Sequence, residues 1–263
     1  MLGRIYAIAL NTFREAIRKR FLYAVLLLVV GANLFTIVLG EMSLNHQSRV
    51  AQDVGLAAIR IAGCCTAIIL GALLLYNEIQ RRTIHTIISK PIERYEFVLG
   101  KYLGMVMTLT SLVGLFTLAM LWVLGLQSMS FTTELVKAVL LAYVEILLVA
   151  GLAVFFSAFT SPVLSGVFQF FLWRLGHVTP EMRQAVESAD DAWIRTVCEA
   201  ALRVLPDLHL FAISGNTFEG EHVSVHANFV SWGYVTTTAT YGLLYLAALL
   251  ILAVIIFARR DFV

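Results

Sequence analysis

Six long apolar stretches, almost free of charged residues, dominate this sequence. A helix needs about 20 apolar residues to cross a hydrocarbon core of roughly 30 Å. The six stretches occupy residues 21–40, 56–76, 102–124, 135–159, 163–178 and 232–258. The fifth is the shortest, and it contains Arg174. The sequence therefore predicts an all-α polytopic membrane protein with six transmembrane helices.

The composition supports this class and excludes others. Of the 263 residues, 60% are apolar and 14% are charged, against roughly 45–50% and 25% in soluble domains. Polar side chains are too few to cover a soluble core, which also excludes a disordered chain or a nucleic-acid-binding domain. The three cysteines provide no disulfide framework. We expect a single transmembrane domain over residues 1–263 that binds no nucleic acid.

The distribution of positive charge predicts the orientation in the membrane. Lys and Arg concentrate before the first stretch, between the second and third, and after the sixth. Because Lys and Arg favour the cytoplasmic side of a membrane, both termini are predicted to be cytoplasmic in a bacterial inner (plasma) membrane. The residues are Arg4, Arg14, Arg18, Lys19, Arg20, Arg81, Arg82, Lys90, Arg94, Lys101, Arg259 and Arg260.

Two segments outside the six stretches have recognisable patterns. Residues 1–20 place apolar side chains on one side of a helix and basic ones on the other, which predicts an interfacial (elbow) helix at the cytoplasmic surface. The outer segment, 179–231, opens with Thr179-Pro180, typical of a helix start, and this helix is expected to continue to Pro206. The residues beyond it are apolar enough to dip into the outer leaflet, so we expect a partly re-entrant helical segment. They are Leu208, Leu210, Phe211, Ile213 and Phe218.

The cytoplasmic segment 77–101 reads NEIQRRTIHTIISKPIERYEFVLGK. Its helical stretch, residues 82–89, has an apolar edge and is terminated by Pro91. An exposed apolar edge on a basic helix indicates a protein partner or the membrane surface. The edge consists of Ile84, Ile87 and Ile88.

This segment resembles the loop between the second and third spans of ABC-2 type transporter permeases. Those loops carry Glu, then Thr, a hydrophobic stretch, Pro, an aliphatic residue, Arg and a final Gly-Lys. The matching positions are Glu78, Thr83, Ile87, Ile88, Pro91, Ile92, Arg94, Gly100 and Lys101.

The resemblance implies the membrane subunit of an ATP-binding-cassette exporter. Two permease chains, identical or related, would pair and form the translocation path. Each would place the coupling helix in its 77–101 loop against a separate ATPase subunit that has a P-loop. The apolar docking contacts would come from Ile84, Ile87 and Ile88, and the polar ones from Arg81, Arg82 and Arg94. The full set of ATPase-docking residues would be Glu78, Arg81, Arg82, Thr83, Ile84, Ile87, Ile88, Pro91 and Arg94.

The sequence contains no nucleotide site of its own. A P-loop requires GxxxxGK[ST], but Gly100-Lys101 has Tyr95 at the first Gly position and Tyr102 at the Ser/Thr position. We therefore expect no catalytic, cofactor-binding or metal-binding residues in this chain, with ATP and magnesium bound by the partner ATPase. The alternatives are an ATP-independent channel, carrier or scaffold, and a membrane-embedded enzyme. The cargo stays open, and a periplasmic partner moved by mechanical work is one candidate.

Four charged residues lie within the apolar stretches, and one of them, Lys137, is at the edge of the fourth. Glu145 is near the middle of the fourth, where an acid normally faces the bundle interior or a wet cavity. It could line the translocation path, or it could be protonated or bonded to a Ser, Thr or Tyr of a neighbouring helix. Arg60 and Arg174 lie near the outer ends of their stretches, where snorkelling to the interface would accommodate them.

Overall fold

The computed structural model describes residues 2–42, 47–80, 93–126, 133–188, 192–213, 216–218, 221–223 and 230–259. Its helices are α1 (Leu2–Ile17), α2 (Arg20–Met42), α3 (Gln47–Gln80), α5 (Arg94–Leu126), α6 (Thr133–Ser157), α7 (Pro162–His177), α8 (Thr179–Ser188), α9 (Ala192–Val204), the 3₁₀ helix η1 (Leu208–Phe211) and α10 (Trp232–Arg259). Two short strands, β1 (Asn216–Phe218) and β2 (Glu221–Val223), pair antiparallel.

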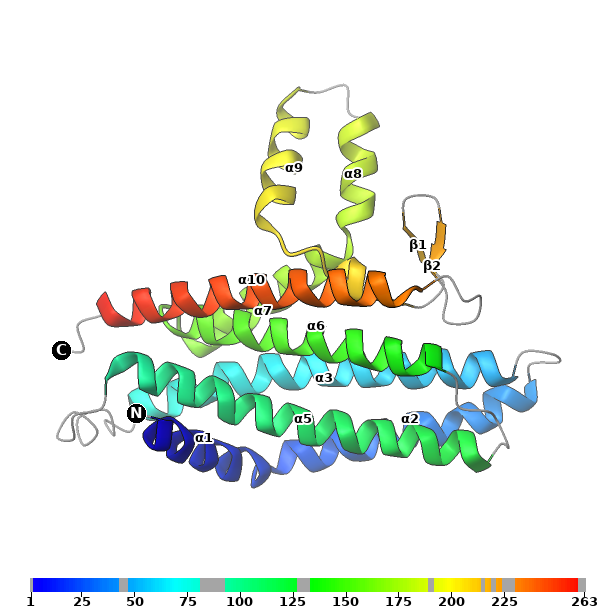
Figure 1. Ribbon diagram of the computed structural model, residues 1–263, viewed down its shortest axis with the longest axis horizontal. Coiled ribbons are helices and arrows are strands. Elements are labelled where there is room, and N and C mark those ends of the chain that lie inside the picture. The colour runs from blue at the N-terminus through cyan, green and yellow to red at the C-terminus, as the bar shows by residue number, and fades with distance from the viewer. Residues whose placement is uncertain are drawn as a thin grey trace.

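The long helices α2, α3, α5, α6 and α10 run side by side as a bundle (Figure 1). α6 lies at its centre and contacts α3, α5, α7 and α10. A helix that is apolar on all sides is suited to burial, and α6 contributes several fully buried side chains. These include Leu141, Ile146 and Leu148.

Five helices in the described ranges are long and apolar enough to cross a membrane, namely α2, α3, α5, α6 and α10. Four of them contain a predicted stretch and α6 ends two residues before its stretch does, at Ser157, which confirms the polytopic helical class. The remaining stretch, 163–178, corresponds to α7. This helix has 16 residues, or about 24 Å at 1.5 Å per residue, less than the roughly 30 Å of a hydrocarbon core. The six-crossing topology therefore stays a prediction.

A row of small residues on α3 packs against α6. Gly63 faces the side chain of Ile146, and Gly71 faces Ala153, with no room at either glycine for a Cβ atom. Small residues at such spacing let membrane helices approach closely. The close contact made by this row lies within one chain.

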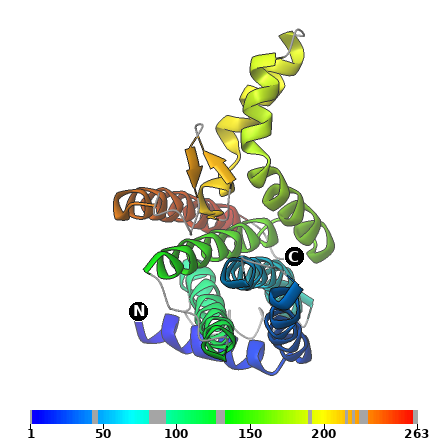
Figure 2. The same cartoon turned by 90° about the vertical axis from the view of Figure 1, so that its right-hand side faces the viewer.

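The outer segment departs from its predicted form. The single helix expected from Thr179 to Pro206 is wrong, because the structure has two helices, α8 and α9, side by side as a hairpin. The hairpin stands away from the bundle in both views (Figures 1 and 2). Asp191 immediately precedes α9, and Asp is favoured at the position before a helix begins. The Asp pair at 190–191 therefore favours a new helix start over continuation.

Candidate functional site

The two ends of the predicted docking segment lie at the same end of the bundle. α3 ends at Gln80 and α5 begins at Arg94, close to the labelled termini (Figure 1). Glu78 lies in the last turn of α3. The other predicted docking positions lie outside the described residues, and their role stays a prediction. They are Arg81, Arg82, Thr83, Ile84, Ile87, Ile88 and Pro91.

Arg94 joins the start of α5 to the end of α10. Its Nη1 donates hydrogen bonds to the carbonyl oxygens of Ala258, at 2.6 Å, and Phe257, at 3.5 Å. The last carbonyls of a helix lack intrahelical partners and attract cations. The rings of Phe97 and Phe257 also stack, with centroids 5.8 Å apart. The sequence analysis assigned Arg94 to a partner protein and missed this contact within the chain.

Glu96 joins the start of α5 to α1. Its side chain is 3% exposed, and Oε2 lies 3.8 Å from Nη1 of Arg4. The same oxygen accepts a hydrogen bond from the backbone N–H of Glu93 at 3.4 Å, as in one half of a capping box. This bond satisfies one of the donors that a helix start leaves free. The first turn of α5 is thus fixed to two other helices.

Two glycines continue the contact between α5 and α1. A Cβ atom on Gly104 would lie 2.6 Å from the Ala9 carbonyl oxygen and 2.5 Å from Cβ of Thr12. Gly100 faces Ile8 in the same way, with 2.8 Å to its Cβ. α1 is therefore closely packed against the helix that follows the docking segment.

Glu145 forms the centre of a buried polar cluster. Its side chain is 0% exposed, and Oε1 accepts hydrogen bonds from Nε1 of Trp173 at 3.1 Å and Sγ of Cys64 at 3.6 Å. Nε2 of His177 lies 3.3 Å from the same oxygen, outside good hydrogen-bond geometry, while Oε2 has no hydrogen-bond partner among the described residues. The cluster joins α6 to α3 and α7. The donors are a thiol and an indole, with an imidazole beside them, whereas Ser, Thr or Tyr hydroxyl groups were one of the alternatives left open by the sequence.

α7 has a polar inner face and an apolar outer face. Ser165, Gln169 and Trp173 are buried, and Nε2 of Gln169 donates to Oγ of Ser165 at 2.7 Å. Val163 and Phe171 on the outer face are 76% and 60% exposed. Polar groups in membrane proteins normally face the bundle interior or a wet cavity, so this polarity is suited to a lipid environment.

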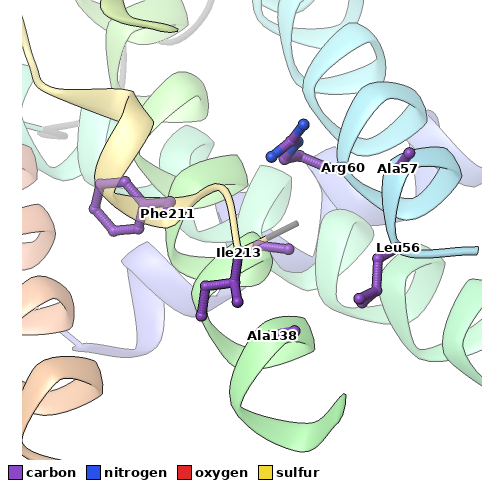
Figure 3. A pocket seen from close by; sticks show the side chains of 7 residues that line it. Leu56, Ala57, Arg60, Ala138, Phe211 and Ile213 are labelled. Carbon is purple, nitrogen blue, oxygen red and sulfur yellow. The ribbon is translucent and has the colours of Figure 1, made fainter. Parts of the chain in front are cut away.

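Arg60 points into the protein. Its side chain extends from α3 into a small pocket that Phe211, Ile213 and Ala138 also line (Figure 3). Its Nε is buried without a hydrogen-bond partner in the part of the chain that the structure describes. The residue as a whole is half-buried, and snorkelling of its guanidinium to the outer interface stays a prediction.

Asp207 fixes the root of the α8–α9 hairpin. Its carboxylate accepts hydrogen bonds from Oγ1 of Thr179 at 2.7 Å and Nη2 of Arg183 at 2.8 Å. Its backbone N–H donates to the hydroxyl of Tyr241 in α10 at 3.1 Å. The following 3₁₀ helix is anchored too, since the Tyr234 hydroxyl donates to the Leu210 carbonyl at 2.8 Å. The sequence analysis missed Asp207, although its place directly after the helix-terminating Pro206 was a usable signal.

The apolar residues after Pro206 are buried against the bundle helices, and their entry into the outer leaflet stays a prediction. Leu208, Phe211 and Ile213 are 0%, 1% and 4% exposed. The far end of the outer segment is held by Lys137 of α6. Its Nζ donates to the Val230 carbonyl at 2.7 Å and to both carboxylate oxygens of Glu134 at 2.9 and 3.0 Å. The outer segment is therefore attached to the bundle at both of its ends.

Within the described ranges, no group of three His, Cys, Asp or Glu side chains is placed to hold a metal ion.

A bundle of long apolar helices with a polar cluster at its centre defines a multi-pass helical membrane protein. The family described as "ABC-2 family transporter protein" matches residues 6–262. The chain belongs to this family, which makes it the permease component of an ABC transporter. A comparison with curated proteins finds no match.

Proposed function

We propose that this chain is the permease of an ATP-driven exporter and works as a pair with a second copy or a related permease. Membership of the ABC-2 family supports a membrane transport role, and the outward direction rests on the resemblance of the 77–101 loop. A separate P-loop ATPase binds ATP and magnesium and performs the hydrolysis. The complex lies in a bacterial inner membrane, with both permease termini in the cytoplasm.

The coupling loop 77–101 transmits movement of the ATPase to the transmembrane helices. The observation that supports this step most strongly is the anchoring of the start of α5. Arg94 binds the end of α10, Glu96 approaches Arg4, and Gly104 packs on α1. Because α3 also enters the loop, a force on the loop acts on α3 and α5 directly and on α1 and α10 through these contacts.

Glu145 belongs to the interior that rearranges during transport. It binds groups of α3 and α7, and one of its carboxylate oxygens has no partner among the described residues. A displacement of α7 relative to α6 would open the carboxylate to a path between paired chains. Exposing a carboxylate to lipid is costly, so the opened space would have to be filled with water or lined by protein.

The coupling proposal is tested by replacing Ile87 and Ile88 with Asp in the assembled transporter. Two carboxylates at an apolar docking edge would have to lose their hydration on docking, so we expect at least a tenfold loss of ATPase stimulation and of co-purification. Val197→Asp is the control, because this apolar side chain is 56% exposed on α9. Unchanged stimulation in the double variant, with normal membrane insertion, would show that the loop is not the docking element.

A further inference from the structure

α1 presents three different faces along its length. The first is buried against α5, where Ala9, Thr12 and Ala16 are 2%, 0% and 0% exposed. The second is apolar and exposed, with Leu2, Tyr6 and Ile17 at 84%, 61% and 39%. An interfacial helix that only covered protein would not need this second face. Its exposure is suited to contact with acyl chains.

The third face is polar and mostly basic. Asn11, Arg14, Glu15, Arg18 and Lys19 line an open pocket on it. The single acid is engaged, because Oε1 of Glu15 lies 3.5 Å from Nζ of Lys19. Arg14 and Arg18 are exposed, one helical turn apart, and give the pocket an excess of positive charge.

Arg14 lies where this pocket borders the apolar face, and Arg18 follows directly after α1 ends at Ile17. Residues three and four apart are neighbours on a helix surface, so Arg14 is adjacent to Leu10 and Ile17. Directly after α1, α2 begins with Arg20 and becomes a candidate membrane span. The guanidinium groups therefore lie next to acyl-facing side chains at the point where the chain enters the membrane. Lipid phosphates occupy this level.

We propose that Arg14 and Arg18, assisted by Asn11 and Lys19, bind the phosphate of an anionic phospholipid in the leaflet near the two chain termini. Guanidinium groups bind phosphate oxygens in a bidentate manner. A headgroup without a compensating ammonium group is preferred, because juxtamembrane basic residues gain most from anionic lipid. The bound headgroup would then hold α1 against the membrane surface.

A consequence for transport follows if the proposed coupling is correct. α1 packs directly on α5 through Gly100 and Gly104, and α5 follows the coupling loop. Anionic lipid should therefore raise ATPase stimulation in the assembled transporter. This consequence rests on the proposed function, whereas lipid binding itself does not.

Native mass spectrometry of the purified chain tests the binding. The chain is titrated with phosphatidylglycerol and, separately, with phosphatidylcholine, which has the same phosphate but carries an ammonium group. We expect roughly tenfold more retained phosphatidylglycerol than phosphatidylcholine in the wild type, and equal retention of the two lipids in R14Q/R18Q. The matched control R195Q/R203Q removes two positive charges from α9 and should keep the preference. R14K/R18K, which keeps the charge, should retain part of it.

Three results would overturn the proposal. The first is equal retention of the two lipids by the wild type, and the second is an unchanged preference in a folded R14Q/R18Q variant. The third is displacement of phosphatidylglycerol by inorganic phosphate at equal concentration, which would indicate a free-phosphate site. If R14Q/R18Q keeps its lipid preference but no longer co-purifies with the ATPase, the basic face binds protein instead. Lipid binding without an effect on ATPase stimulation would support the lipid site but contradict its proposed coupling through α5.

Discussion

Glu145 shows how single residues order the interior of this bundle. A carboxylate without access to water is costly unless its oxygens accept hydrogen bonds, and Oε1 receives donors from both α3 and α7. His177 is held beside it, since Nδ1 of its ring lies 2.9 Å from the Trp173 carbonyl oxygen. The cluster therefore holds the end of α7 against α6.

Replacing Glu145 tests this anchoring. In E145A the Trp173 indole N–H loses its acceptor, and a buried donor left without a partner costs about 1–3 kcal/mol. E145Q keeps an acceptor oxygen and should lose less. The melting temperatures of the purified E145A and E145Q variants measure these losses of stability. E199A is the control, because Glu199 forms an exposed pair with Arg195 at 3.7 Å that contributes little. Equal melting temperatures for E145A and E199A would contradict the anchoring role.

The sequence predicted the position of Glu145 but not its partners. A lone acid in an apolar stretch is visible from composition alone. Cys64, Trp173 and His177 come from two other helices, and local spacing does not specify which helices will contact α6. The surroundings of Arg60 were missed for the same reason, because its distance from the end of an apolar stretch gave no information about the 3₁₀ helix packed beside it.

At the scale of elements, α5 connects the loop to the rest of the bundle. Its first turn is fixed to α10 by Arg94 and lies beside Arg4 of α1 through Glu96. The close approach of α1 and α5 continues to Gly104. Moving the start of α5 without moving α1 would require breaking these contacts.

Two matched glycine substitutions on α5 test this packing. In G104A the new Cβ would meet the Ala9 carbonyl oxygen at 2.6 Å, so we expect overpacking to destabilise the chain by about 1–3 kcal/mol. In G114A nothing lies within 4 Å of the new Cβ, and Ala favours a helix over Gly by about 1 kcal/mol. The melting temperature should therefore fall in G104A and rise in G114A. A G104A chain that is as stable as G114A would contradict the close contact.

The elements themselves were largely predictable, because apolar stretches of spanning length leave few alternatives to a helix. The sequence did not identify α1 as the helix that packs on Gly100 and Gly104. The break between α8 and α9 was missed because apolar residues recur at helical spacing on both sides of it. Whether such a segment continues or folds back depends on Asp207 and Tyr241, which lie far away in the sequence.

At the scale of the whole molecule, the 77–101 loop and the α8–α9 hairpin lie at different parts of the bundle. One end carries the chain termini and both ends of the coupling loop (Figure 1). The α8–α9 hairpin extends to one side of the bundle (Figure 2), and its root is fixed to α10 through Asp207. A force on the loop would therefore meet a connected set of helices, as the proposed coupling to a separate ATPase requires.

The most direct test of this account is site-specific cross-linking from the coupling loop in the assembled, nucleotide-loaded transporter. Cysteine is introduced as Ile87→Cys in a chain whose Cys65 and Cys198 are replaced by Ser, while the buried Cys64 is retained. Val197→Cys on α9 serves as the control position. The account predicts that position 87 cross-links to the ATPase subunit and is protected from a water-soluble thiol reagent, while position 197 does not cross-link to it. Position 87 reacting freely with the reagent and forming no cross-link in that state would contradict the account.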